Sequence, residues 1–448
     1  MSSPQESLIH EATPLFRLID SIDKFVAEHQ SSYTYTDANE SFLGRIRTLA
    51  RDAKQRVSNI VQRPVTGPQE ANQQYSDLII EKDRWKVLHT FIKPASDADT
   101  LVLPVPLIRL AAEHMRKVKG IASAELVTLL THELNYFQDS TGLKELHDLI
   151  FVELPYSQGP SFFANLIIYH ELGHYVFERL SETQPAEPSF TNLALVMEDA
   201  FESQLGKWLT TGSTIAWAKR VLNVWAREIF CDLFAVRFVG PAFTFALIDI
   251  LSLLGLMREG AEVTFDEEHP ASALRFKEQI DQLKRDDWWN TVASLESRHI
   301  SLSSELASKP ASDYQFAFRH EEVPGFVEAF LQIAPNVYPL VEAITPSPQD
   351  AALDFRARRA DVEACLLAGV VPSHLLQHGG RESPLPESII NASYTFYLTS
   401  MPNLMDRLID QKPSDLSQRG DLVAKLEGWT LKALEDHQLY ADRRKGKT

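Results

Sequence analysis

Residues 167–177, IIYHELGHYVF, are the stretch around which the fold of this 448-residue chain can be worked out. Apolar residues surround His170 and His174, whose four-residue spacing would place both side chains on one face of a helix, with Cβ atoms about 5–6 Å apart. Two imidazoles at that separation can bind one metal ion. Glu171 lies one position round the helix, where it can hydrogen-bond a water molecule on the metal instead of binding the metal. The stretch therefore predicts a helix with a metal site.

The pattern H-E-x-x-H is specific. At this composition it should arise by chance in only about three chains of this length in a hundred, and the apolar helix around it lowers that expectation further. The alternative is a pair of core histidines whose hydrogen bonds are satisfied inside the protein. The sequence favours the metal site over this alternative.

A catalytic zinc site needs a third protein ligand, with the fourth position left to water. The segment NVWAREIFCDLFAVRFVG, on a second predicted helix, supplies Glu228, 54 residues after His174, and Asp232 one turn later. Glu228 can bind the metal. Asp232 can accept the outer N–H of one ligating imidazole, which fixes the tautomer of the ring and raises its basicity. Cys231 is the candidate for a fourth protein ligand, which would close the site and make it structural.

HELGH followed by E-x-x-x-D resembles the motifs of the gluzincin metallopeptidases, the thermolysin-like class in which a glutamate is the third zinc ligand. The words REIFCDLFA are similar to the E-x-x-A-D segment of HtpX-like and CaaX-prenyl peptidases, with Cys231 in place of the usual small alanine. The resemblance implies a zincin-like core and one Zn²⁺ per chain, held by His170, His174 and Glu228. Those families are embedded in membranes, and this sequence predicts no spanning segment, so neither substrate nor location is carried over.

A further match lies at EHPASALRF, residues 268–276, which is similar to the His-Pro segment with a following arginine in those peptidases. By that resemblance His269 would donate a hydrogen bond to the tetrahedral oxyanion, and Arg275 would orient the site. A positioned donor aimed at developing negative charge is a large catalytic contribution. Taken alone, His269 and Pro270 mark the start of a helix, so both interpretations stay open. The resemblance covers only the motifs between His170 and Arg275.

The chain as a whole is expected to be mainly α (α+β). Apolar residues recur at three- and four-residue intervals through most of it, and the breaks fall at polar or Gly-Pro stretches. Residues 148–154 are a candidate strand, to which an extended peptide would add by analogy with the resembling class. Helices are predicted at residues 7–28, 39–62, 69–91, 106–119, 123–137, 161–180, 191–209, 214–239, 242–257, from 270 onward, 324–333, 350–367 and 386–409.

The expected organisation has three regions. A helical N-terminal region spans residues 1–145, a zincin-like catalytic core spans residues 146–285, and a helical C-terminal region spans residues 286–448. The helical regions could recognise substrate, cover the cleft or bind a regulatory protein partner.

Composition limits the partners of the chain. A formal charge of −17 and a pI near 5.3 disfavour nucleic acid and anionic membrane surfaces, because phosphate binding depends on Lys and Arg. The longest apolar run, residues 242–257, is shorter than a bilayer span and contains Asp249, so no membrane insertion is expected. Only two cysteines occur, Cys231 and Cys365, and no secretory signal is evident. A cytoplasmic location is therefore expected.

The sequence predicts a zinc metallopeptidase that acts on a protein or peptide substrate, with Glu171 as the general base. Two alternatives stay open. One is a helical scaffold or interaction protein with a structural or degenerate zinc site. The other is a zinc hydrolase of non-peptide amides or esters.

Overall fold

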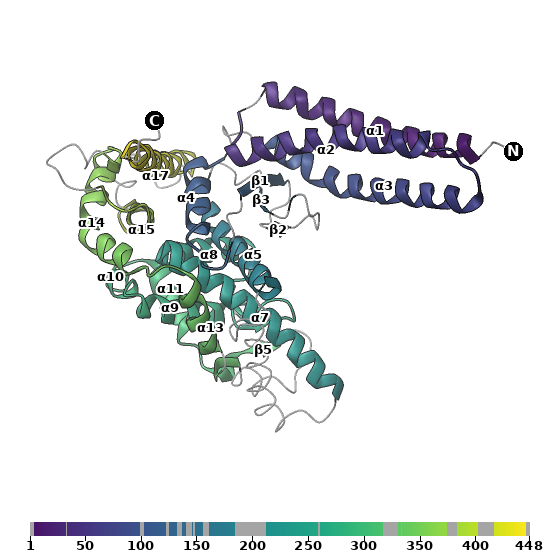
Figure 1. Ribbon diagram of the computed structural model, residues 1–448. Helices are drawn as coiled ribbons and strands as arrows, with labels where there is room; N and C mark the ends of the chain where they lie inside the picture. Colours follow the sequence, from purple (N-terminus) through teal and green to yellow (C-terminus); the bar gives the residue numbers. More distant parts are fainter. Residues whose placement is uncertain are drawn as a thin grey trace. The chain divides into compact units, whose positions relative to one another are not determined.

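The structure, a computed structural model, divides into two compact units (Figure 1). Unit 1 comprises Met1–Val105 and Ser123–Pro160, and unit 2 comprises Pro106–Ala122 and Ser161–Thr448. These boundaries differ from the three predicted regions, since residues 146–160 belong to unit 1 and residues 161–285 share unit 2 with the C-terminal region. The residues that the structure describes are 4–32, 34–98, 103–121, 125–131, 137–139, 146, 148–155, 161–183, 212–258, 260–316, 330–332, 334–373, 383–401 and 416–444.

Most of the described residues are helical, which confirms the predicted mainly α class. In unit 1 the helices predicted at residues 7–28, 39–62 and 69–91 are confirmed as α1 (Pro4–Ser32), α2 (Asp37–Gln62) and α3 (Pro68–Asp97). Local sequence sets where two of them begin. Thr36 caps α2 by accepting the N–H of Asn39 at 3.2 Å, and Pro68 opens α3, where its missing N–H costs nothing.

The sheet of unit 1 has the strand order β1-β3-β2, from β1 (Glu125–Thr131), β2 (Phe137–Asp139) and β3 (Leu149–Pro155). β1 runs parallel to β3 and β2 runs antiparallel to it. The predicted strand at residues 148–154 is thus confirmed, but the predicted helix at residues 123–137 is wrong. The segment ELVTLLT is buried along nearly its whole length, and a continuous apolar run cannot be assigned to helix or strand by periodicity.

The place of β3 also corrects the interpretation that a peptide substrate adds to it. β3 pairs with β1 from Leu149 to Pro155 and with β2 at Phe151, Val152 and Glu153. Both of its edges are therefore in use.

A buried side chain covers the outer edge of β1. Asn39 of α2 accepts the N–H of Thr128 at 3.0 Å and donates to the carbonyl of Thr128 at 2.7 Å. The same amide donates to the carbonyl of Ala95 in α3 at 3.2 Å. Because buried backbone groups must be paired, Asn39 satisfies the N–H and carbonyl of Thr128 at the edge of β1. It also joins this strand to α2 and α3.

Unit 2 contains the two histidines of the HELGH motif. Its short 3₁₀ helices are η3 (Ala164–Ile167), η4 (Ala311–Asp313) and η5 (Ala334–Asn336), and two short strands, β4 (Thr264–Phe265) and β5 (Gln315–Phe316), pair in parallel. Its α-helices are α4 (Val105–Met115), α5 (Ile168–Thr183), α7 (Gly212–Val239), α8 (Pro241–Leu253), α9 (Ser272–Arg285), α10 (Trp289–Val292), α11 (Arg298–Ala307), α13 (Val337–Ile344), α14 (Gln349–Leu367), α15 (Pro386–Thr399) and α17 (Leu416–Arg444).

Most helices predicted for this unit are confirmed, with ends that differ by a few residues. The prediction at residues 161–180 is corrected in one respect, since its first turn is the 3₁₀ helix η3 and the α-helix begins at Ile168. The prediction at residues 386–409 is confirmed as far as Thr399. The helix predicted at residues 191–209, most of the one at 324–333 and the end of the one at 386–409 lie outside the described residues.

The junction between α7 and α8 is held by Asn391 of α15. Its amide donates to the carbonyl of Val239 at 3.0 Å, and its oxygen accepts the N–H of Ala242 at 2.8 Å. Gly240 stands between them with a φ of 63°, a left-handed conformation that favours glycine. The apolar run of residues 242–257 is largely the buried helix α8. Within the described part of the chain, no helix is long and apolar enough to cross a membrane.

Candidate metal centre

The two helices that carry the motif residues, α5 and α7, pack against each other in unit 2. Glycine makes the close approach possible. A Cβ atom at Gly173 would lie 2.7 Å from the Cα of Cys231 and 3.0 Å from its Cβ. Gly173 of HELGH and the small Cys231 of REIFCD are therefore the point at which the helices touch, with His170, His174 and Glu228 around it.

The imidazoles and the Glu228 carboxylate converge through the Nε2 atoms of the two rings. The Nε2 atom of His170 lies 3.3 Å from Oε2 of Glu228, and the Nε2 atom of His174 lies 3.4 Å from Oε1 of Glu228. Direct N–H···O hydrogen bonds are usually near 2.9–3.0 Å. Ligand atoms about 2.0–2.2 Å from a tetrahedral zinc ion would be roughly 3.3–3.5 Å apart, so the observed spacing fits a ligand set better than a direct hydrogen bond.

The other nitrogen of each ring, Nδ1, has its own partner. Nδ1 of His170 lies 2.8 Å from Oδ1 of Asp232, and Nδ1 of His174 lies 3.3 Å from the Sγ atom of Cys231. A metal-binding histidine usually donates its second ring N–H to such an acceptor, which fixes the tautomer. The predicted role of Asp232 thus has the contact it requires, whereas the acceptor for His174 was not predicted.

A second ligand set must be weighed against this one. Ligand atoms of His170, His174 and Cys231 lie within 4.8 Å of one another, so these three residues could also hold an ion. We favour Glu228 as the third ligand because Cys231 faces the Nδ1 side of His174, and the Nδ1 atom of His170 is already bonded to Asp232. Burial also raises the pKa of the Cys231 thiol well above its usual value, and the neutral thiol is a weak ligand.

Asp232 is the centre of a buried hydrogen-bond network. Arg275 of α9 donates to both of its oxygens, from Nε at 2.8 Å and from Nη2 at 2.7 Å, and Gln279 donates at 3.0 Å. With His170, four bonds hold this one carboxylate. The resemblance implied that Arg275 orients the site, and its contacts suit that role, because they reach His170 through Asp232. Gln279 was missed, although its i+4 spacing from Arg275 places the two on one helix face.

The electrostatics of the cluster favour a positive charge near the Nε2 atoms of His170 and His174, which both face Glu228. Burial alone would lower the pKa of His170, but its hydrogen bond to Asp232 and the facing Glu228 carboxylate raise it to about 10. Burial together with the neighbouring His170 lowers the pKa of His174 to about 3. Burial would raise the pKa of Glu228, but the facing His170 ring holds that pKa well below its usual range. These pKa shifts favour one positive charge among the three side chains and disfavour a second.

Glu171 and His269 have different settings. Glu171 is buried in the first turn of α5, directly after His170. His269 precedes α9 with a side chain that is 58% exposed; its backbone N–H donates to Oδ1 of Asp266 at 2.6 Å, and its ring lies 3.7 Å from that atom. These contacts suit a residue at a helix start, and the oxyanion role of His269 stays a prediction.

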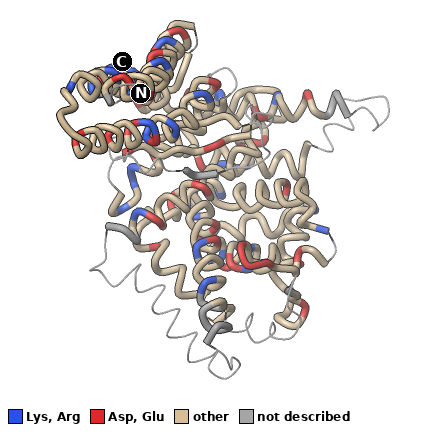
Figure 2. The backbone as a smooth tube through the Cα atoms, turned by 90° about the vertical axis from the view of Figure 1, so that its right-hand side faces the viewer, with Lys and Arg blue, Asp and Glu red and all other residues tan. Residues whose placement is uncertain are grey.

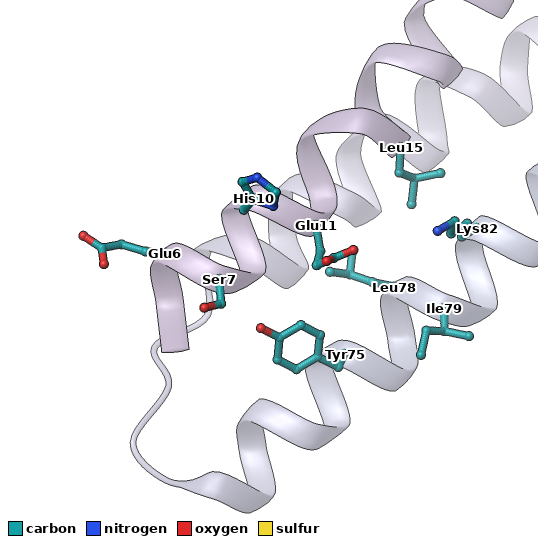
Figure 3. A pocket seen from close by; sticks show the side chains of 9 residues that line it. All are labelled: Glu6, Ser7, His10, Glu11, Leu15, Tyr75, Leu78, Ile79 and Lys82. Atoms are coloured by element: carbon teal, nitrogen blue, oxygen red, sulfur yellow. The ribbon is translucent and has the colours of Figure 1, made fainter. Parts of the chain in front are cut away.

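A cavity of about 730 Å³ lies in unit 1, in a groove between α1 and α3 (Figure 3). Its lining includes the apolar Leu15, Leu78 and Ile79 and the polar His10, Glu11 and Lys82. The described residues provide no cluster of metal ligands there. Its size alone does not make it the candidate site.

Charge is mixed over the described parts of both units. Figure 2 shows basic and acidic residues interspersed along the backbone, without a continuous basic stripe in the part of the chain that is drawn in colour.

Comparison of the chain with family models, curated proteins and solved structures finds no match. The candidate site therefore rests on its own geometry.

Proposed function

We propose that this chain is a zinc-dependent metallopeptidase, with His170, His174 and Glu228 as the metal ligands and Glu171 as the general base. One observation carries the proposal. Both Nε2 atoms face the same buried carboxylate at 3.3 and 3.4 Å, while both Nδ1 atoms have partners on the outer side of the rings. This is the arrangement expected of a ligand set with its supporting hydrogen bonds.

The charge of the cluster supports a divalent ion. Glu171, Glu228, Asp232 and Arg275 are all buried. The Glu228 carboxylate faces two imidazoles, which give up any proton when they bind a metal, so a divalent cation would take the place of that positive charge. Buried charge is costly unless it is paired, and one divalent cation would balance it. Two nitrogens and one carboxylate oxygen are also the donors of a catalytic zinc site with an open fourth position.

Zinc bound there would polarise the scissile carbonyl and lower the pKa of a water molecule toward neutrality. The residues of the chain would do the rest. Glu171, beside the ligands, would take the proton from the attacking water and pass it to the leaving amine nitrogen. Asp232 would hold the Nδ1 proton of His170, and Arg275 with Gln279 would keep the Asp232 carboxylate in place.

Partners and location follow from composition and belong to the same proposal. The substrate would be a protein or peptide and not a nucleic acid, because the chain is strongly acidic. Cys231 and Cys365 are free thiols, which supports a reducing compartment such as the cytoplasm.

The decisive experiment compares the purified protein with its Glu171→Gln variant, with Glu178→Gln as the control. Glu178 lies two turns along α5 with a side chain that is 49% exposed. Elemental analysis should find one zinc per chain in all three proteins. Digestion of a peptide library should be abolished by a chelator and slowed about 10²–10⁴-fold by Glu171→Gln alone. A wild-type protein that holds zinc but leaves every peptide intact would argue against a peptidase and for a small-molecule hydrolase or a structural site.

A further inference from the structure

A second series of hydrogen bonds, separate from the one at Asp232, reaches the metal-binding helix α5. The hydroxyl of Tyr169, the residue before His170, lies 2.9 Å from Nδ1 of His114 in α4. The Nε2 atom of His114 lies 2.9 Å from Oε1 of Glu387 in α15. Tyr169 and His114 are buried, with 0% and 2% exposure. Three helices are thus joined next to a predicted metal ligand.

The direction of the hydrogen bonds follows from the chemistry of the groups. A carboxylate can only accept, so the Nε2–H of His114 donates to Glu387, and in that tautomer Nδ1 accepts from the Tyr169 hydroxyl. Burial would raise the pKa of Glu387, but the bond from His114 outweighs it and lowers that pKa. Glu387 is therefore an ionised acceptor at the start of α15, where the helix dipole also favours negative charge.

Aromatic packing holds the ring of His114 in this orientation. Phe238 of α7 is stacked on His114, with ring centroids 4.9 Å apart and planes 23° apart. The ring of Tyr169 lies 6.2 Å from the same phenylalanine. The rings of Phe238 and Tyr169 therefore leave the imidazole of His114 little freedom to turn away from Tyr169.

These hydrogen bonds meet the metal-binding helix at its junction with a 3₁₀ helix. The 3₁₀ helix η3 ends at Ile167 and α5 begins at Ile168, so the number of residues per turn changes directly before Tyr169. The N–H of Ile168 bonds to the carbonyls of Asn165 and Leu166, so the two helices are joined directly at this point. Within the first turn of α5, His170 is hydrogen-bonded to Asp232, and Tyr169 is hydrogen-bonded to His114.

We propose that Tyr169, His114 and Glu387 form a positioning relay, which fixes the rotation of the first turn of α5 and thereby the direction in which His170 presents Nε2 to the metal. The inference rests on the proposed function and deepens it. None of the three residues is among the proposed metal ligands; each acts through His170.

The test compares Tyr169→Phe with Tyr394→Phe. Tyr394 is also buried in unit 2, and its hydroxyl donates to Oδ2 of Asp249 at 2.7 Å. Both variants lose one buried phenol hydrogen bond and should lose similar thermal stability. Only Tyr169→Phe should weaken zinc binding, by about tenfold, and change the visible absorption spectrum of the Co²⁺-loaded protein.

Two variants of Glu387 complete the design. Glu387→Gln keeps an oxygen acceptor for His114 and should retain the wild-type Co²⁺ spectrum, whereas Glu387→Ala should behave like Tyr169→Phe. Wild-type affinity and spectrum in Tyr169→Phe would overturn the relay and leave the proposed function standing. A wild-type protein that binds neither zinc nor Co²⁺ would overturn both.

Discussion

At the scale of single residues, the question is which side chain completes the metal site. Glu228 faces the Nε2 atoms of both histidines, and Cys231 faces only Nδ1 of His174. We expect Glu228→Gln to weaken zinc binding by at least about a hundredfold, because it removes a ligand charge, and Cys231→Ala by about tenfold, because it removes only an acceptor behind the ring.

Titration of each variant with zinc against a chromophoric chelator measures this difference. Cys231→Ser supplies the control, since its hydroxyl can still accept the N–H of His174. If Cys231→Ala abolished binding while Glu228→Gln kept it, the third ligand would be the thiol.

A buried carboxyl group outside the metal centre, that of Glu278, should make the folding stability of the protein depend on pH. Glu278 of α9 has 2% exposure and accepts the hydroxyl proton of Tyr338 at 2.5 Å. Burial raises its pKa from 4.5 to about 7, although Tyr338 and Lys277 pull it downward. Between pH 4.5 and 7 the folded protein keeps this proton and the unfolded chain loses it. Stability should therefore fall as pH rises through this window, by on the order of 3 kcal/mol in total.

Glu278→Gln should remove that loss, since the amide carries no charge and still offers Tyr338 an oxygen. We expect the free energy of unfolding in urea to rise at pH 8 by on the order of 1–3 kcal/mol and to stay near the wild-type value at pH 4. An equal pH slope in the variant and the wild type would contradict the assignment.

At the scale of elements, the crossing of α5 and α7 depends on Gly173. A methyl group there would meet the backbone of Cys231 at 2.7 Å, and a backbone atom cannot turn aside as a side chain can. Alanine is the better helix former by about 1 kcal/mol, but forcing the helices apart typically costs 1–3 kcal/mol or more. We expect Gly173→Ala to lower the melting temperature and to weaken zinc binding together.

Gly428→Ala in α17 is the matched control, because nothing lies within 4 Å of the methyl group it would add. It should leave zinc affinity unchanged and keep or raise stability. Calorimetry and a zinc titration on both variants would check this. Unchanged zinc affinity in Gly173→Ala would mean that the crossing does not set the ligand geometry.

Short-range patterns account for what the sequence predicted at this scale. His170 with His174, and Glu228 with Asp232, are one helical turn apart, so spacing alone placed each pair on a helix face. The helix wrongly predicted over residues 123–137 had no such pattern, because β1 is buried on both faces. The contacts of Cys231 with His174 and of Gln279 with Asp232 need knowledge of how helices cross, which a single sequence does not contain.

At the scale of the whole molecule, the candidate metal site belongs entirely to unit 2, since its residues all lie between His170 and Gln279. A metal that binds only the folded state should therefore stabilise this unit, by about 4 kcal/mol when free zinc is a thousand times its Kd. We expect a chelator to speed amide hydrogen exchange in α5 and α7 and to leave α1 and α2 unchanged. Restored protection on adding zinc back is the control, and no change in α5 or α7 would contradict metal binding there.

Contacts between residues far apart in the chain could not be predicted from the sequence. The predicted regions follow the order of the chain, whereas residues 106–122 leave the first unit and join the second. The bond between His114 and Glu387 spans 273 positions, far beyond any helical or strand period. Such pairings are set by packing between elements and have no local signal.

The hydrogen bond between His114 and Glu387 also affects the order in which the protein can fold during translation. On the ribosome, His114 emerges when Glu387 has not yet been translated, so α4 must wait through most of synthesis before its imidazole meets that acceptor. The nascent HELGH helix therefore leaves the exit tunnel without one of its anchors. Truncated chains that end before α15 should expose a loosely held histidine pair, which makes late translation the stage at which chaperones would be needed most.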